Sequence, residues 1–255
     1  MTELTGPARI ASAPSDSAGI APIGVDPAGG GLVRRLEELR LDLAALLWPT
    51  ACVHCGAADR DVCLPCLVEL REQEMPAPFS AGPPVFVRAA YAGPLRAALV
   101  AFKHEGRTGF ARELGRQLRP PLAAALACCT GPAAPVIVAA PSRPSRTRQR
   151  GYRPVELLVS RALRGQRVPC LRLRALRTTR GRAGQVGLGP AERLENARRI
   201  AVRGDTRRVL SGREVILVDD VITTGATVAA ARDALASAGA QVVAIVALCR
   251  SERRS

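Results

Sequence analysis

The sequence predicts an α/β fold, a mostly parallel sheet flanked by helices, with a small cysteine-containing module in front of it. Two observations support this prediction. From residue 85 onward, short apolar runs of strand length alternate with longer segments whose apolar residues recur at helical spacing, and this alternation is typical of right-handed βαβ crossovers in a parallel sheet. Apolar residues make up 47% of the 255 residues, which is enough to bury a domain core of this kind.

Three parts are expected along the chain. Residues 1–30 are rich in Ala, Gly, Pro and Ser and lack periodicity, as is typical of a disordered tail. Residues 31–78 hold a predicted amphipathic helix at 32–47, which Pro49 ends, followed by the cysteine module. A Pro-rich linker then leads to the predicted α/β domain at 85–250.

Each element of the α/β domain is predicted from its period. Apolar runs of about four to eight residues indicate strands, whereas apolar residues three and four positions apart indicate helices. The predicted strands are 85–91, 135–140, 170–176, 214–218 and 241–248. The predicted helices are 94–102, 110–128, 153–163, 192–199 and 227–237.

The net charge of +15 is compatible with a polyanionic partner. However, Lys103 is the only lysine and Asn196 the only asparagine, a bias typical of a GC-rich genome. With aromatic residues at 3%, stacking on single-stranded nucleic acid has little support. The chain has no uncharged apolar run of about eighteen residues and its first 31 residues lack the layout of a secretory signal. We therefore expect no membrane insertion and a cytoplasmic location.

The most informative segment is 215–227, V-I-L-V-D-D-V-I-T-T-G-A-T. Its first four residues predict a strand buried on both faces, and its last five turn the chain into a helix. Backbone amides at a helix N-terminus bind phosphate. Gly225 lets the backbone approach closely, and threonine hydroxyls add donors. The residues predicted to form this phosphate cradle are Thr223, Thr224, Gly225, Ala226 and Thr227.

Asp219 and Asp220 follow the predicted strand, at the edge where open α/β sheets bind ligands. Their carboxylates can accept hydrogen bonds from the two ribose hydroxyls of a sugar whose 5-phosphate lies in the cradle. An acidic pair and an anion cradle together meet the needs of a phosphoribosyl group. The alternative, a solvated strand end followed by an ordinary helix cap, does not require both features at once.

Segment 215–227 resembles the motif that binds 5-phosphoribosyl 1-pyrophosphate (PRPP) in the phosphoribosyltransferases. The resemblance implies a Rossmann-like sheet of the type I phosphoribosyltransferase kind. It also implies that Asp219 and Asp220 hold the ribose at the catalytic centre, that 223–227 holds the 5-phosphate, and that the reaction uses magnesium-bound PRPP. Mg²⁺ would neutralise charge on the departing pyrophosphate.

Further segments resemble one branch of this superfamily, the ComF/GntX family associated with competence and DNA uptake. They are 91–106 (Y-A-G-P-L-R-A-A-L-V-A-F-K-H-E-G), 140–152 (A-P-S-R-P-S-R-T-R-Q-R-G-Y), and Gln185 followed by 191–196 (A-E-R-L-E-N). Together with the phosphate segment they occur in the family's order. The residues matched in the first and third segments are Lys103, Gln185, Arg193 and Asn196.

Segment 140–152 follows a predicted strand, where the family places its pyrophosphate loop. Arginines there can contact pyrophosphate or a nucleic-acid backbone through two hydrogen bonds each, and a solvated basic loop is an equal alternative. Arg150 and Gly151 match the family's R-G-[FY], and Arg143 is a further candidate. The two residues after Tyr152 depart from the family's usual Asn-Gln, so no role is carried over to them.

Gln185, Arg193 and Asn196 fall in or beside a glycine-rich stretch that suits a mobile loop closing over the substrate. Lids of this kind exclude water from a reactive cation. A plain surface loop is the alternative.

Cys52, Cys55, Cys63 and Cys66 form a C-x2-C-x7-C-x2-C array. In a cytosolic chain, paired C-x-x-C motifs favour a metal site over disulfides, and four thiolates suit tetrahedral zinc. Redox-active thiols are the weaker alternative. A module this small has little core, so one structural zinc is expected to supply much of its folding free energy. His54 is expected to be a bystander.

Two functions follow from these features. The first is a magnesium-dependent transferase that moves a phosphoribosyl group between PRPP and an unidentified acceptor. The second is a non-catalytic protein of ComF type, whose pocket senses PRPP or a nucleotide while basic surfaces and the zinc module bind nucleic acid or a competence-type protein. An oligomer is compatible with either.

Overall fold

The computed structural model describes residues 51–251 apart from 59, 80–81, 166–168 and 180–199. The predicted tail at 1–30, the helix at 32–47 and the helix at 192–199 lie outside the described residues. Within the described part of the chain, no helix has the length and apolar character needed to cross a membrane.

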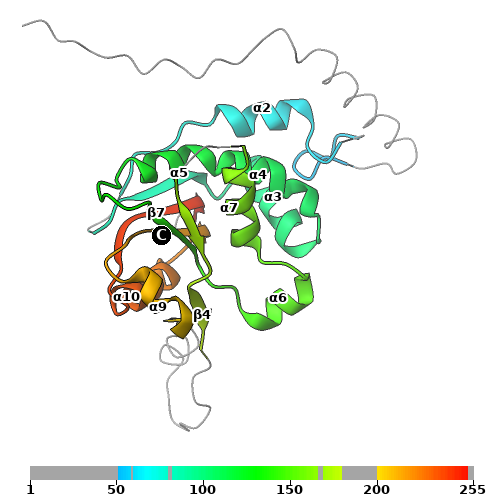
Figure 1. The fold of residues 1–255 in the computed structure, drawn as a ribbon. Helices are drawn as coiled ribbons and strands as arrows, with labels where there is room; N and C mark the ends of the chain where they lie inside the picture. The colour runs from blue at the N-terminus through cyan, green and yellow to red at the C-terminus, as the bar shows by residue number, and fades with distance from the viewer. Residues whose placement is uncertain (1–50, 59, 80–81, 166–168, 180–199, 252–255) are drawn as a thin grey trace, which may run out of the picture. The chain divides into compact units, whose positions relative to one another are not determined.

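A five-stranded parallel sheet forms the centre of the described chain (Figure 1). Its strand order is β1-β7-β6-β2-β3. The strands are β1 (Val85–Ala90), β2 (Val136–Ala139), β3 (Leu171–Leu173), β6 (Glu214–Ile222) and β7 (Gln241–Arg250). β6 lies in the middle, and its run of buried apolar residues reflects cover on both faces. The predicted α/β fold is confirmed.

Helices cover both faces of this sheet (Figure 1). One face packs against α3 (Gly93–His104), the 3-10 turn η1 (Thr108–Phe110), α4 (Ala111–Gln117), α5 (Arg119–Leu126) and α7 (Pro154–Leu163). The other face packs against α10 (Ala226–Ala236) and a small antiparallel sheet of β4 (Leu176–Thr178) and β5 (Ile200–Val202), followed by η2 (Gly204–Thr206) and α9 (Arg207–Leu210). Because successive strand residues point to opposite faces, Val218 enters the first core and Leu217 the second.

Two predicted elements are divided in the structure. The predicted helix 110–128 consists of η1, α4 and α5, because Pro120 and Pro121 lack the amide hydrogen that a continuous helix needs, and α5 begins with them in its first turn. The predicted single strand 170–176 is wrong. β3 pairs in parallel with the short β2, whereas β4 turns to the other core and pairs antiparallel with β5.

Besides α9, two further short helices lie where the sequence predicts none. They are α2 (Leu64–Glu72), in the cysteine module, and α6 (Pro144–Arg150), in the basic segment. Both have proline in the first turn, which is a helix-start signal. α6 contains no buried residue, so it has no apolar period that could reveal it. Segment 140–152 therefore includes a helix rather than being a loop throughout.

Candidate functional site

The chain leaves β6 and β2 in opposite directions at the same edge of the sheet. After β6 it passes through α10 on one face to reach β7, and after β2 it passes through α7 on the other face to reach β3. Because β2 and β6 are parallel neighbours, their carboxyl ends open a crevice between the two departing connections. Ligands of open α/β sheets bind at such a topological switch point.

Asp219 and Asp220 border this crevice, but they lie inside β6 rather than after it. The predicted end of the strand at Val218 is wrong, because β7 continues as a partner and carries β6 on to Ile222. On the other side, β2 pairs with β6 only as far as Val218, where the Ala140 amide donates to the Val218 carbonyl oxygen at 2.7 Å. The two aspartates therefore lie just beyond the point where β2 and β6 separate.

The segment after β6 has the geometry of a phosphate cradle. Gly225 is the N-cap of α10 with φ of 75°, a left-handed conformation that favours glycine, and no side chain caps the helix there. A β-carbon at Gly225 would meet nothing within 4 Å, so the backbone angle rather than crowding requires glycine. Thr223 and Thr224 are exposed, and Ala226 N donates to Thr224 Oγ1 over a long 3.4 Å. Ala226 and Thr227 begin α10, so their amides belong to the first turn, where a helix offers donors to an anion.

The backbone of Asp220 holds the Asp219 carboxyl group in place. Asp220 N donates to Asp219 Oδ1 at 2.8 Å. Burial, reinforced by the charge of Asp220, raises the pKa of Asp219 to about 7. A cation or a pair of hydroxyl donors that approaches Asp219 would favour its charged form. The acidic pair is therefore prepared for a ligand that supplies such groups.

Lys103, in the last turn of α3, brings a positive charge to the acidic pair. Its Nζ lies 2.7 Å from Asp220 Oδ1, and the two side chains are only 18% and 13% exposed. The pair fixes the Asp220 side chain from a helix that is distant in sequence. The structure thus brings Lys103 to the acidic pair, next to the segment that forms the cradle.

Tyr152, which the sequence interpretation did not single out, fixes the end of α3. Its hydroxyl donates to the carbonyl oxygen of Phe102, the neighbour of Lys103, and the Phe102 and Tyr152 ring centroids are 5.2 Å apart. The end of α6 is thereby tied to the helical turn that carries Lys103. The sequence could have indicated this residue, because the chain has only two tyrosines and this one lies in segment 140–152.

The predicted pyrophosphate-loop residues lie on α6, which follows β2 at the same edge of the sheet as the crevice. Arg143 is the exposed N-cap residue and Arg150 the half-buried last residue of α6. Gly151 ends the helix in the left-handed conformation, with φ of 76°. The predicted lid residues, which lie outside the described residues, are Gln185, Arg193 and Asn196.

Asp219 and Asp220 are the described residues that could hold a divalent cation at the crevice. Carboxylate oxygens suit Mg²⁺, which usually keeps waters or phosphate oxygens as further ligands. One oxygen of each carboxylate is already engaged, Asp219 Oδ1 by an amide and Asp220 Oδ1 by Lys103. The donor set therefore fits an ion that arrives with a phosphate ligand better than one held by protein alone.

The four predicted zinc ligands meet at one point. Their sulfur atoms all lie within 4.8 Å of one another, and Cys55 Sγ and Cys63 Sγ are 3.4 Å apart. A tetrahedron with Zn–S of about 2.3 Å has S···S edges of about 3.8 Å, so the donors and their spacing suit such an ion. Cys52 and Cys66 are buried. His54 is exposed and is not needed as a ligand.

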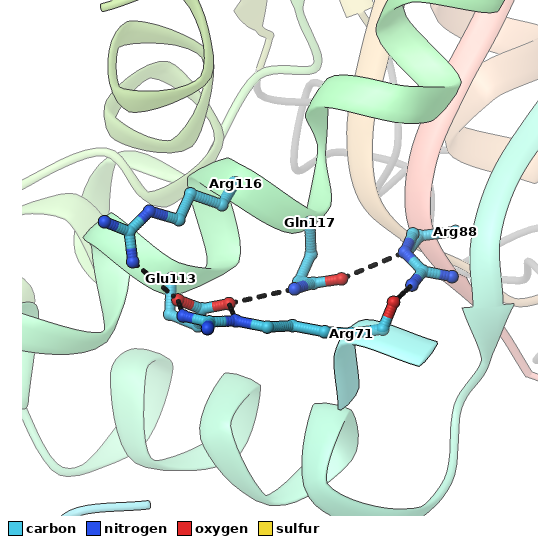
Figure 2. Close-up of polar contacts among 5 residues, drawn as sticks. All are labelled: Arg71, Arg88, Glu113, Arg116 and Gln117. Carbon is cyan, nitrogen blue, oxygen red and sulfur yellow. Dashed lines mark hydrogen bonds and ion pairs between the residues drawn. The ribbon is translucent and has the colours of Figure 1, made fainter. Parts of the chain in front are cut away.

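Arg88 fixes the end of α2 to the α/β domain (Figure 2). This residue of β1 is only 4% exposed. Its guanidinium donates to the carbonyl oxygens of Leu70 at 3.2 Å, Arg71 at 3.0 Å and Gln73, and to Gln117 Oε1 at 2.9 Å. Carbonyls at a helix C-terminus lack intrahelical partners. A side chain of the main domain therefore caps the helix of the cysteine module.

Glu113 completes this polar network (Figure 2). Arg71 donates to both of its carboxylate oxygens, from Nε at 3.2 Å and Nη2 at 3.0 Å, while Arg116 and Gln117 add bonds of 3.0 and 2.9 Å. Burial alone would raise the pKa of Glu113, but these donors bring it below its usual value. The module is thus attached through charged and polar groups as well as through buried Leu70.

Comparison with known proteins gives a result consistent with this site. The family model of the phosphoribosyl transferase domain matches residues 178–255, which include β6, the cradle, α10 and β7. The match supports the superfamily that the resemblance indicates, and it does not distinguish the ComF branch within it.

One solved structure that resembles the chain is described as the allosteric regulatory enzyme of purine biosynthesis. The identity is 20% and the TM-score 0.31, over 54% of this chain and 25% of that one. The matched part therefore spans about a quarter of that protein. Among curated proteins, none matches this chain significantly.

Proposed function

We propose that this chain binds magnesium-bound PRPP at the switch-point crevice and transfers the phosphoribosyl group to an acceptor. One observation carries the proposal. An acidic pair and a helix N-terminal cradle occur together at the carboxyl end of β6, within the segment similar to a phosphoribosyl transferase domain. That edge of an open α/β sheet is where ligands bind.

In this proposal the amides and hydroxyls of 223–227 bind the 5-phosphate, and the ribose hydroxyls donate to Asp219 and Asp220. The pyrophosphate extends toward α6, where Arg143 and Arg150 contact its oxygens. Mg²⁺, when held beside Asp219 and Asp220 with the substrate, would neutralise charge on the departing pyrophosphate.

Transfer exchanges one bond at C1 of the ribose. The bond to the pyrophosphate oxygen breaks and its electron pair leaves with pyrophosphate, while a lone pair of the acceptor forms the new bond and the acceptor's proton passes to solvent. Positive charge grows on the ribose ring in between, and the Asp219 carboxylate lies where it can stabilise that charge. Lys103, paired with Asp220, offsets the repulsion between the acidic pair and a polyanionic substrate.

The second candidate is a non-catalytic role of ComF type. The basic surface around α6 favours it. Arg143 and the arginines of α6 form a basic surface with no buried residue, at the end of β2. In that role the crevice senses PRPP or a nucleotide, and the basic surface contacts a nucleic acid backbone or a protein of a competence-type assembly.

Incubating the full chain with PRPP, Mg²⁺ and a mixture of nucleobases and amines separates the two candidates. We expect pyrophosphate release that depends on Mg²⁺ and on one component of the mixture, together with a phosphoribosylated product detected by mass spectrometry. Binding of PRPP without release in any mixture would contradict transfer and favour the second candidate. Failure to bind PRPP at all would contradict both.

The pKa of Asp219 predicts how PRPP affinity depends on pH. The pKa of the Asp219 carboxyl group is about 7 in the free protein. Below that pH, a ligand that binds the carboxylate form must first displace a proton from it. We therefore expect calorimetric affinity to rise by roughly tenfold between pH 6 and pH 8, because each pH unit below the pKa changes the charged fraction by up to about tenfold. The Asp219→Asn variant should lose most of this rise in affinity. An equal rise in the variant would contradict the assignment of the pH dependence to Asp219.

The free protein should respond to pH in the opposite sense. A carboxyl group whose pKa is raised by folding favours the protonated form of the folded state. Its contribution to stability is fully present below its unfolded pKa, which is near 4, and is lost as the pH rises through about 7. As the pH rises, PRPP should therefore bind more tightly and the free protein should become less stable, in both cases because Asp219 loses its proton.

We further propose that Cys52, Cys55, Cys63 and Cys66 hold one structural Zn²⁺. The proposal is supported by four sulfur atoms that lie within 4.8 Å of one another, in a module with few buried residues of its own.

A further inference from the structure

The turn at the end of α3 contacts two other segments of the chain besides the acidic pair. Lys103, in the last turn of the helix, reaches Asp220 at 2.7 Å. Its fully buried neighbour Phe102 accepts a hydrogen bond from the Tyr152 hydroxyl, just beyond the end of α6. Arg107, four residues after Lys103, contacts the cysteine module. The lysine that faces the acidic pair therefore lies at a junction of three segments.

Backbone hydrogen bonds join Arg107 to the helix that carries Lys103. The amides of Glu105 and Arg107 both donate to the Ala101 carbonyl oxygen, at 3.1 and 3.3 Å. Between them Gly106 turns the chain with φ of 70°, a left-handed conformation that favours glycine. Because two hydrogen bonds close this short turn, a displacement of Arg107 also displaces the last turn of α3.

The Arg107 side chain joins this turn to the cysteine module. Its guanidinium forms an ion pair with Asp61 Oδ1 and lies over the ring of Phe110, 5.1 Å from the ring centroid. Phe110 is 4% exposed and belongs to the core of the main domain. A longer contact of 3.9 Å with Glu105 stays within the turn itself. The guanidinium thus connects a fixed aromatic ring of the main domain with a carboxylate of the module.

Asp61 belongs to the part of the module that places the cysteines. It stands two residues before Cys63, and its carbonyl oxygen accepts a hydrogen bond of 3.1 Å from the amide of Val53, inside the first C-x-x-C motif. A path of contacts therefore leads from the four sulfur atoms through Asp61 and Arg107 to Lys103 and the acidic pair. Contacts of this kind can carry energetic coupling between separate sites.

We infer that the cysteine module positions Lys103 at the acidic pair, with Asp61 and Arg107 as the connecting residues. The inference rests on the proposed function in so far as the positioned lysine serves PRPP binding. The ion pair of Asp61 with Arg107 keeps the end of α3 where Lys103 meets Asp220. That lysine lowers the repulsion between the two aspartates and a polyanionic substrate. The affinity for PRPP therefore depends on the module, and Arg107 and Asp61 are positioning residues because they act through Lys103.

Calorimetric titration of the full chain with magnesium-bound PRPP tests the inference. Arg107→Gln and Asp61→Ala should each weaken binding by about three- to tenfold, an effect typical of residues that couple separate sites. In a Lys103→Met background, where the lysine is absent, neither substitution should weaken binding further. Arg71→Gln is the matched control, because it removes the module's ion pair with Glu113 and leaves Arg107 in place. It should leave the affinity for PRPP unchanged.

Thermal melting of the same variants without ligand gives a second readout, which does not depend on PRPP. Arg107→Gln should lower the melting temperature less in the Lys103→Met background than in the unaltered chain, because both residues act on one turn. If PRPP fails to bind the unaltered chain while this coupling is present, the proposed function falls and the positioning of Lys103 stands. Additive effects of Arg107→Gln and Lys103→Met on either quantity, or equal weakening of PRPP binding by Arg71→Gln, would overturn the inference and leave the proposed function intact.

Discussion

Replacing both Asp219 and Asp220 by asparagine is expected to remove the rise in melting temperature that magnesium-bound PRPP gives to the unaltered chain. Asparagine keeps the size of each side chain but removes the charges that, in the proposed function, hold the ribose hydroxyls and the cation. At a ligand concentration about a hundred times Kd, binding stabilises a protein by about 2.7 kcal/mol. In a domain of this size, that energy corresponds to a rise of roughly 5–10 °C, which the variant should lose.

Melting of the two proteins with and without ligand measures this effect. Asp233→Asn is the matched control, because Asp233 lies on α10 with a 70% exposed side chain that pairs with neighbouring Arg232. That variant should keep the full rise. A double variant that still responds to PRPP as the unaltered chain does would show that the ligand is held elsewhere.

Two opposing effects act on the stability of the free double variant, and the first involves Lys103. Its amine is 18% exposed and its partner in the ion pair is Asp220. Removing that charge leaves a shielded cation with a neutral neighbour, while the loss of Asp219 removes a buried group that prefers to be neutral. The two effects oppose each other, so the melting temperature of the free protein is a weaker measure of the site than the response to ligand.

Segment 215–227 could be predicted from the sequence because its signal is local. Four apolar residues, two acids and a threonine- and glycine-containing turn specify strand, carboxylates and helix start within a single stretch. The order of helices and strands was predictable for the same reason, since each element carries its own period. The end of β6 was not, because it depends on how far β7 continues as a partner.

The partners of these residues could not be derived from local pattern. Lys103 reaches Asp220 from the last turn of α3, which packs on one face of the sheet, and the sequence marked it only as a residue matched by resemblance. Arg88 reads as one arginine among many in this composition. Its position on the buried β1 and its four acceptors become visible only in the folded chain. α6 has no apolar period, so its helical form was hidden as well.

Arg88 also connects zinc binding to the stability of the whole domain. Three of its acceptors are carbonyl oxygens at the end of α2, and α2 carries Cys66 in its first turn and begins after Cys63. The other two cysteines lie in the preceding turn, where Gly56 N donates to the Cys52 carbonyl oxygen at 2.9 Å. If the four sulfur atoms lose their metal, α2 keeps its contacts through Leu70 and Arg71 but loses the fixed start that helps to position those carbonyls.

Removing the metal is therefore expected to destabilise the α/β domain and not only the module. A buried arginine that loses its acceptors costs about 3–5 kcal/mol, so the main unfolding transition should fall by roughly 6–20 °C in a domain of this size. Cys66→Ser should have the same effect and should lower the zinc content, which we expect to be one ion per unaltered chain. Cys128→Ser, which alters a half-buried cysteine outside the cluster, should change neither quantity.

The Arg88→Leu variant tests whether the effect passes through this side chain. Leucine at this buried strand position needs no acceptors, so removal of the metal should lower the main transition much less in Arg88→Leu than in the unaltered chain. Atomic absorption and thermal melting of both proteins, before and after chelation, give the four values of a double-mutant cycle. An equal fall in both proteins would place the coupling elsewhere, for example in the ion pair of Arg71 with Glu113. A chain that binds no zinc and melts unchanged with a chelator would contradict the structural metal itself.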